Sequence, residues 1–170
     1  MKKKPITYAF IDSQNLNMGV RSEGWKLDYR VFRQYLRSKY NISKAFIFIG
    51  HIDGNESLYT SLQTAGFILV FKPTMQLPNG SVKGNVDAEL VLHAMIQYPH
   101  YDTAVIVSGD GDFYCLVEYL EKNGKLLKIM VPNKHFSGFL RKFNRYIVRI
   151  DLLRVALEIK KTKISGRSKP

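Results

Sequence analysis

Residues 104–113 read AVIVSGDGDF, a run of four apolar residues followed by Ser108 and two Gly-Asp pairs. Uninterrupted apolar, β-branched runs are typical of strands that are buried on both faces, as in a parallel sheet. Glycine and aspartate end such a strand and open a turn. The stretch therefore predicts a buried strand that brings Asp110 and Asp112 to the edge of a sheet.

The same alternation of short apolar runs and longer helix-period segments extends along the chain. It predicts an α/β fold in which helices cover both faces of a mainly parallel sheet. With 170 residues, we expect one domain, residues 1–159, followed by a basic flexible tail, residues 160–170. Strands are predicted at 6–11, 45–49, 67–71, 104–107, 126–131 and 146–150. Helices are predicted at 27–40, 56–65, 86–97 and 113–123, with a segment at 137–143 and a final helix from 151.

Polar residues follow several of the predicted strands at the point where each strand ends. The carboxyl ends of parallel strands meet at one edge of the sheet, where ligands bind. We therefore expect these polar side chains to be neighbours. They are Asp12 and Asn15 after the first strand, His51 and Asp53 after the second, Asp87 at the start of the helix after the third, and Ser108, Asp110 and Asp112 after the fourth.

The aspartates at this edge predict a site for a divalent cation. Two carboxylates about 4 Å apart repel by about 4 kcal/mol at an effective dielectric near 20, so converging aspartates raise one another's pKa. A bound cation removes that conflict, and oxygen-only ligands favour Mg²⁺ or Mn²⁺ over zinc. The alternative is that Asp110 or Asp112 only caps the helix after the fourth strand. Asp12 or Asn15 would then only cap a helix or close a turn.

The net charge of +12 favours a polyanionic partner, and we expect nucleic acid. The alternative is a basic surface with no ligand. Tyr98, His100 and Tyr101 either stack on unpaired bases or pack where their helix ends. The candidate phosphate-binding residues are Lys72 and Lys83, in a predicted loop before Asp87, and the cluster of Arg141, Lys142 and Arg145.

Neither a secretory signal nor a membrane span is expected. The apolar run at 6–11 is too short for either, so we expect a cytoplasmic protein without membrane attachment. The single cysteine, Cys115, falls in an apolar helical stretch, and we expect it to pack in the core rather than act as a nucleophile. The sequence leaves open a homodimer or a protein partner.

Three motifs resemble those of the NYN domains of the LabA-like (DUF88) family, in the PIN-like nuclease superfamily. They are IDSQNL at 11–16, KGNVD at 83–87 and, most specific, VSGDGDF at 107–113, followed by KNGK at 122–125. Residues 137–140 and 146–147 resemble the closing segment of that family. The resemblance covers most of the chain and implies a PIN-like three-layer α/β/α sandwich with an acidic Mg²⁺ or Mn²⁺ site that acts on RNA.

The same resemblance implies roles for individual residues. Many family members carry a further aspartate where this chain has His93, six residues and about 9 Å along the helix from Asp87. A ligand there would be peripheral, and His93 is alternatively a plain surface residue. By the resemblance, Asp12, Asp87, Asp110 and Asp112 hold the metal or its water, Asn15 orients a ligand or a phosphate oxygen, and Ser108 donates a hydrogen bond.

Two hypotheses follow for function. The first is a metal-dependent ribonuclease that hydrolyses RNA phosphodiester bonds through the aspartate cluster, which the complete set of four aspartates favours. The second is an NYN module that binds RNA or a protein partner without cleaving, which His93 and the lack of an obvious general base favour.

Overall fold

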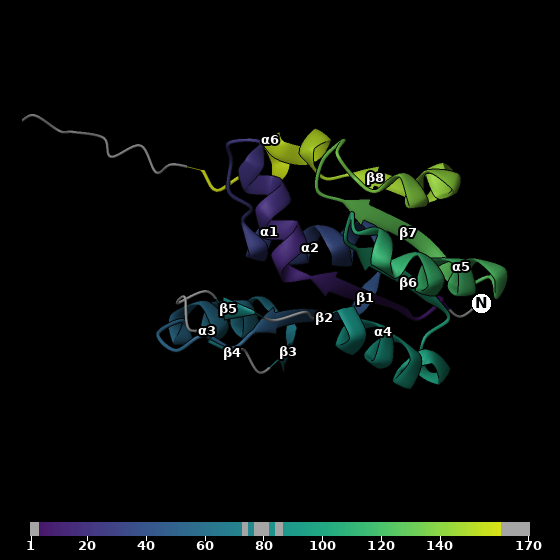
Figure 1. The fold of residues 1–170 in the computed structure, drawn as a ribbon, viewed down its shortest axis with the longest axis horizontal. Coiled ribbons are helices and arrows are strands. Elements are labelled where there is room, and N and C mark those ends of the chain that lie inside the picture. The colour runs from purple at the N-terminus through teal and green to yellow at the C-terminus, as the bar shows by residue number, and fades with distance from the viewer. Residues whose placement is uncertain (1–3, 73–74, 77–81, 84–86, 161–170) are drawn as a thin grey trace, which may run out of the picture.

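A six-stranded sheet forms the centre of the computed structural model, which describes residues 4–72, 75–76, 82–83 and 87–160 (Figure 1). The strand order is β3-β2-β1-β6-β7-β8, and each neighbouring pair is parallel. The expected three-layer α/β/α fold is therefore confirmed. The strands are β1 (Thr7–Asp12), β2 (Ile42–Gly50), β3 (Ile68–Lys72), β6 (Thr103–Val107), β7 (Leu126–Val131) and β8 (Ile147–Arg149).

The four predicted long helices are present, and their ends agree with the prediction to within two residues. They are α2 (Tyr29–Tyr40), α3 (Glu56–Ala65), α4 (Asp87–Ile96) and α5 (Tyr114–Lys122). Short 3-10 helices form elsewhere: η1 (Tyr98–His100), η2 (Gly111–Phe113), η3 (Gly138–Tyr146) and η4 (Asp151–Leu153). The helix expected from residue 151 is thus η4 followed by one turn of α6 (Arg154–Leu157).

Helix α1 (Ser13–Ser22) was not expected, because its sequence, SQNLNMGVRS, is rich in residues with low helix propensity. Two features stabilise it. The Asp12 carboxylate caps its first turn by accepting a hydrogen bond of 3.1 Å from the backbone N–H of Asn15. Leu16 and Val20, four residues apart on one face, are buried against the sheet. Capping and tertiary packing therefore outweigh the propensity of the segment.

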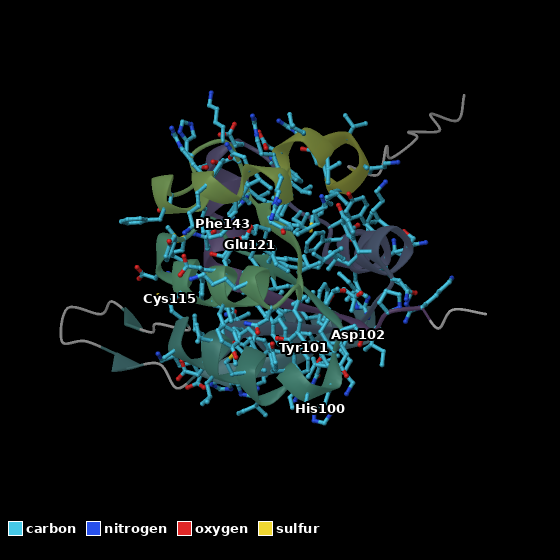
Figure 2. The ribbon with its side chains drawn as sticks, turned by 90° about the vertical axis from the view of Figure 1, so that its right-hand side faces the viewer. His100, Tyr101, Asp102, Cys115, Glu121 and Phe143 are labelled. Atoms are coloured by element: carbon cyan, nitrogen blue, oxygen red, sulfur yellow. The ribbon has the colours of Figure 1, made fainter. Side chains whose placement is uncertain are left out.

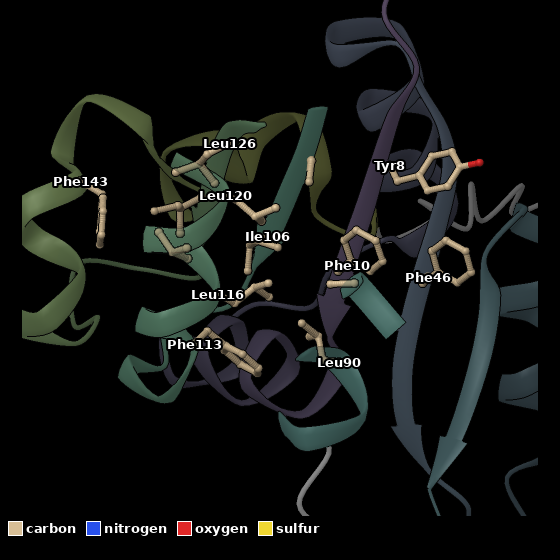
Figure 3. Packing of buried hydrophobic residues seen from close by; sticks show 14 of the residues in the cluster. Tyr8, Phe10, Phe46, Leu90, Ile106, Phe113, Leu116, Leu120, Leu126 and Phe143 are labelled. Atoms are coloured by element: carbon tan, nitrogen blue, oxygen red, sulfur yellow. The ribbon is translucent and has the colours of Figure 1, made fainter. Parts of the chain in front are cut away.

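The two faces of the sheet bury separate apolar clusters. Helices α1, α2, α3 and α6 cover one face, whereas α4, α5 and η3 cover the other. On the second face the Phe10 and Phe46 rings stack with centroids 5.5 Å apart, and Leu90 of α4 packs in the same cluster (Figure 3). This packing fixes α4 against the sheet and so fixes the position of Asp87, its first residue.

The segment expected as a loop between β3 and α4 is partly ordered into strands. Met75–Gln76 (β4) and Val82–Lys83 (β5) form an antiparallel pair in which Met75 lies opposite Lys83. The expectation of a loop throughout residues 71–83 was therefore wrong at these two strands and at Lys72, which is the last residue of β3.

The expectation that Cys115 packs in the core is wrong, because its side chain is exposed on α5 (Figure 2). The buried face of α5 carries Leu116, Val117 and Leu120. Position 115 lies about 100° to 160° of helix rotation from these three residues, so its side chain faces outward. No helix within the described ranges has the length and apolar character needed to cross a bilayer.

Tyr101 packs in the core at the end of α4. It is 2% exposed, and its hydroxyl donates a hydrogen bond of 3.0 Å to the backbone carbonyl of Ala94 (Figure 2). Tyr98 contacts the Tyr101 ring, and the Lys125 ammonium lies over both rings. Only His100 of this group is exposed. Tyr98 and Tyr101 therefore close the end of α4, as the packing alternative proposed.

Candidate metal centre at the carboxyl edge of the sheet

The strand order places a crevice between the carboxyl ends of β1 and β6. Across the sheet the strands lie in the order β3-β2-β1-β6-β7-β8, so the chain leaves β1 toward β2 and leaves β6 in the opposite direction, toward β7. At such a switch point the following segments diverge and leave space for a ligand. Asp12 is the last residue of β1, and Ser108 follows β6 directly. These residues therefore lie beside the crevice.

Asp12 is fixed at the base of this edge and is only 4% exposed. Its Oδ1 caps α1, and its Oδ2 accepts a hydrogen bond of 3.2 Å from the Ser108 hydroxyl. Burial raises the pKa of Asp12, and the negative charges of Asp87 and Asp110 raise it further, although the hydrogen bonds from Asn15 and Ser108 oppose the shift. Besides burial, the negative charges of Asp87 and Asp110 therefore raise the pKa of Asp12, as expected for aspartates that converge at one edge of the sheet.

The loop after β6 is held by hydrogen bonds from both sides. The Asn15 side-chain carbonyl accepts from the Gly109 N–H at 2.8 Å, and the Ser108 hydroxyl oxygen accepts from the Asp110 N–H at 3.1 Å. Asp110 in turn caps η2, because its Oδ1 accepts from the Asp112 N–H at 2.9 Å. Ser108 is 1% exposed, so it acts by positioning Asp12 and Asp110.

Gly111 allows this loop to lie against the start of η3. A Cβ atom at position 111 would lie 2.3 Å from Ser137 Oγ and 3.0 Å from a ring carbon of Phe139. The Ser137 N–H also donates to the Gly109 carbonyl at 2.9 Å. Glycine at this position therefore keeps the two aspartates close to the body of the protein.

Asp87, Asp110 and Asp112 converge at the edge of the sheet. Each offers one carboxylate oxygen, and the three oxygens lie within 4.8 Å of one another. Oxygen ligands at about 2.1 to 2.4 Å from one ion are separated by at most about twice that distance, so the three fit a single Mg²⁺, Mn²⁺ or Ca²⁺ ion. Unlike a purely capping set, the cluster joins a carboxylate from α4 to two from the loop after β6.

Capping and metal binding are compatible in this geometry. Asp110 caps η2 through Oδ1 alone, and within the described residues its Oδ2 accepts no hydrogen bond. Asp12 is not among the three carboxylates whose oxygens lie within 4.8 Å of one another. It is buried beside them, and its two oxygens accept hydrogen bonds from Asn15 and Ser108. The capping contacts that formed the alternative are therefore present at Asp12 and Asp110, and metal binding stays a prediction.

A cleft of about 390 Å³ opens over this edge. Asp12, Asp87 and Asp110 line it, together with Asn15, whereas the more exposed Asp112 lies outside the lining. The sequence analysis missed a further wall, which follows β7. The same rule on strand ends would have identified it, because Pro132, Asn133, His135 and Phe136 come directly after the fifth predicted strand, and Gln14 lines the cleft from α1.

Asn133 joins this wall to α1. Its side-chain amide donates to the Gly19 carbonyl at 2.8 Å, and its side-chain oxygen accepts from the His135 N–H at 2.8 Å. A Cβ atom at position 19 would lie 2.4 Å from Cβ of Pro132. The wall therefore depends on close contact with α1 at Gly19.

Three of the basic residues proposed for RNA binding form ion pairs within the protein. Lys72 pairs with Glu89 at 3.3 Å. On η3, Lys142 pairs with Glu118 at 2.7 Å and Arg145 with Glu121 at 2.9 Å, so both bind α5. Arg141 is exposed and forms no ion pair within the described part of the chain. The side chain of Lys83 lies outside the described residues, as does the expected tail from residue 161 onward.

The remaining polar candidates lie away from the cleft lining. The half-buried His93 ring packs on Phe48 at 5.6 Å between centroids, so it is neither a plain surface residue nor part of the cleft. His51 packs between Tyr59 and Phe71 and lies 3.8 Å from Asp53. The structure thus separates these side chains from the aspartate cluster.

Replacing Asp12 by asparagine is expected to stabilise the protein in EDTA. A carboxyl whose pKa is raised on folding favours the folded state while protonated, and this contribution is lost as the pH rises from 3.8 through the raised pKa. At pH 7 the buried charge therefore destabilises the fold, and asparagine removes it while still capping α1. Urea unfolding in EDTA at pH 7 measures the difference, with Asp53→Asn at an exposed site as the control. A lower unfolding free energy for Asp12→Asn would contradict this account.

The fold is a three-layer α/β/α domain with an acidic carboxyl edge, and comparison with known proteins gives its family. The NYN domain family model matches residues 7–153, so the chain belongs to the NYN domain family. It is 26% identical over 165 residues to the low amplitude and bright protein LabA of Synechococcus elongatus, across 91% of this chain and 87% of that protein. A crystal structure of a protein of unknown function, VPA0982 from Vibrio parahaemolyticus, has a TM-score of 0.74 at 26% identity, covering 94% of this chain and all of that one.

Proposed function

We propose that this protein is a metal-dependent ribonuclease that hydrolyses RNA phosphodiester bonds with Mg²⁺ or Mn²⁺ at its aspartate cluster. The observation that carries the proposal is the convergence of Asp87, Asp110 and Asp112, with one oxygen from each inside 4.8 Å. Membership of the NYN family supports nuclease chemistry and nucleic-acid binding. Oxygen-only ligands support a hard divalent cation over zinc.

In this proposal, some residues of the chain bind the ion and others hold those residues in position. A divalent cation, when bound, polarises phosphoryl oxygens and lowers the pKa of water. Asp87, Asp110 and Asp112 supply its carboxylate ligands, and Asp12 adds a buried negative charge facing Asp87 and Asp110. Asn15 and Ser108 keep Asp12 and the loop after β6 in position through their hydrogen bonds. The cleft beside them receives the phosphodiester.

We expect RNA affinity to fall with salt, because phosphate binding releases counterions. Arg141 is unpaired in the described structure, whereas Glu118 holds Lys142. Arg141→Gln is therefore expected to reduce the log–log salt slope for single-stranded RNA by about 0.7, the contribution of one phosphate contact, and Lys142→Gln to change it little. Fluorescence anisotropy in EDTA at several salt concentrations measures both slopes. A slope near zero for the unmodified protein, or a larger effect from Lys142→Gln, would contradict the assignment.

The second candidate function is an NYN module that binds RNA or a protein partner without cleaving. The observation that favours it is the packing of His93 against Phe48, outside the cleft, because this α4 position then adds no ligand to the cluster. The three converged aspartates favour the nuclease, since they complete an ion site without a contribution from residue 93.

Cleavage of end-labelled single-stranded and hairpin RNA distinguishes the two functions. The protein is incubated with Mg²⁺ or Mn²⁺ and, in parallel, with EDTA. Metal-dependent cleavage that EDTA abolishes is the result expected for the nuclease. RNA binding without cleavage in either metal would instead establish the binding module.

A further inference from the structure

A second cleft, of about 480 Å³, lies against α1 and is separate from the carboxylates. Ser13, Asn17 and Arg21, spaced four residues apart, lie along one side of α1 and line this cleft. Asn15, Met18 and Gly19 lie along the other side and line the acidic cleft. Gln14 falls between the two sides by helix rotation and lines both clefts. Helix α1 is therefore a ridge with one cleft on each side, connected at Gln14.

The second cleft combines an apolar surface with cations. Ile49 and Leu58 contribute apolar lining from β2 and α3, and the half-buried Tyr29 contributes an aromatic ring from α2. Arg21 and Lys26 contribute positive charge. No acidic residue is among the described residues that line it. The chemistry of this lining suits a flat, uncharged ring joined to an anion.

Amide side chains add donors and acceptors at this cleft. Asn55 occupies the N-cap position of α3, but its side chain makes no capping hydrogen bond, so its amide stays available to the cleft it lines. The Asn17 carbonyl oxygen accepts from Arg21 Nε at 3.2 Å, which orients the guanidinium along α1. With Gln14, the cleft presents three carboxamides of the kind that pair with the polar edges of nucleobases.

We propose that this second cleft binds one nucleobase of the RNA strand whose phosphodiester reaches the aspartate cluster, with Arg21 and Lys26 on an adjacent phosphate. The assignment rests on the proposed ribonuclease function. A ring stacked on apolar and aromatic side chains binds without regard to base identity, whereas the carboxamides add preference. The strand crosses α1 at Gln14, and a nucleobase held in the second cleft fixes which phosphate lies beside Asp110.

The test introduces a carboxylate into the second cleft. Leu58 is 41% exposed, so Leu58→Glu leaves the core intact, and Leu92→Glu places the same change on the exposed face of α4. Arg21→Gln, with the exposed Arg30→Gln as its control, removes a cation instead. Anisotropy of a labelled single-stranded hexaribonucleotide in EDTA is the measurement. Leu58→Glu and Arg21→Gln are each expected to weaken binding about 10-fold, and the controls by less than about 2-fold.

Binding in EDTA is independent of cleavage, so failure of the proposed function and failure of the subsite give different results. Unchanged affinity in both Leu58→Glu and Arg21→Gln would overturn the subsite even if metal-dependent cleavage is found. Loss of affinity in these variants without cleavage by the unmodified protein would support the subsite and reject the nuclease. If cleavage is found, substrates with one abasic nucleotide are expected to lose cleavage at a single position relative to the cut, and equal cleavage of all would contradict the subsite.

Discussion

Asp110→Asn is expected to weaken binding of Mn²⁺ or Mg²⁺ by roughly 100-fold and to reduce RNA cleavage to the level found in EDTA. Asp110 is the aspartate that both joins the three-carboxylate cluster and lines the acidic cleft after β6. A 100-fold loss of affinity corresponds to about 2.7 kcal/mol. This is a fraction of the Coulomb attraction between a carboxylate and a divalent ion, because asparagine still offers the ion an oxygen ligand. Isothermal titration calorimetry with each metal measures the change directly.

The substitution is designed to leave the loop intact. Asparagine retains a side-chain oxygen that can accept the hydrogen bond from the Asp112 N–H and so cap η2. Asp53→Asn, at an exposed position outside both clefts, is the matched control and should bind metal as the unmodified protein does. Equal affinity of the Asp110→Asn variant and the unmodified protein would show that the aspartates act as helix caps and not as an ion site.

Gly19→Ala is expected to lower the free energy of unfolding by about 1 to 3 kcal/mol, although alanine ordinarily stabilises a helix by about 1 kcal/mol over glycine. A Cβ atom at position 19 would lie 2.4 Å and 2.8 Å from Cβ and Cγ of Pro132. The proline ring has little freedom to move aside, so α1 must separate from the wall that follows β7. Urea unfolding followed by circular dichroism measures the loss.

Gly138→Ala is the control for this change. A Cβ atom at Gly138 meets no other atom within 4 Å, and the position needs no left-handed backbone conformation. We expect an unchanged or slightly raised unfolding free energy there, since alanine restricts the unfolded chain. If Gly19→Ala were as stable as Gly138→Ala, the close packing of α1 on Pro132 would be disproved.

Most of the fold could be predicted from the sequence because its central strands, β1 and β6, are buried on both faces. Continuous apolar runs such as residues 104–107 distinguish such strands from turns, and amphipathic periodicity identifies helices such as 56–65. Helix α1 was missed because its stability comes from the Asp12 cap and from burial of Leu16 and Val20. Neither contribution is visible in the helix propensity of the segment.

The part of the candidate site that was predicted is the part formed by residues at or just after the ends of strands. The rule that parallel strands end at one edge placed Asp12, Asp87 and Asp110 together without knowledge of strand order. It could not show that Ser108 donates to Asp12 or that the Asn15 side chain accepts from Gly109, because those contacts depend on β1 and β6 being neighbours. Pairing of Lys142 and Arg145 with α5 also depends on tertiary contacts. The sequence pattern therefore predicted more unpaired cationic side chains on η3 than the structure contains.

The central claim is that the ion held by Asp87, Asp110 and Asp112 is the ion that cleavage requires. The most direct test compares two Mn²⁺ titrations of the same protein, one followed by calorimetric binding and the other by the rate of cleavage of end-labelled single-stranded RNA. We predict that the concentration for half-saturation and that for half-maximal cleavage agree within about 3-fold when both are measured with bound RNA. Cleavage that persists in EDTA, or saturation of the site without cleavage, would contradict the account.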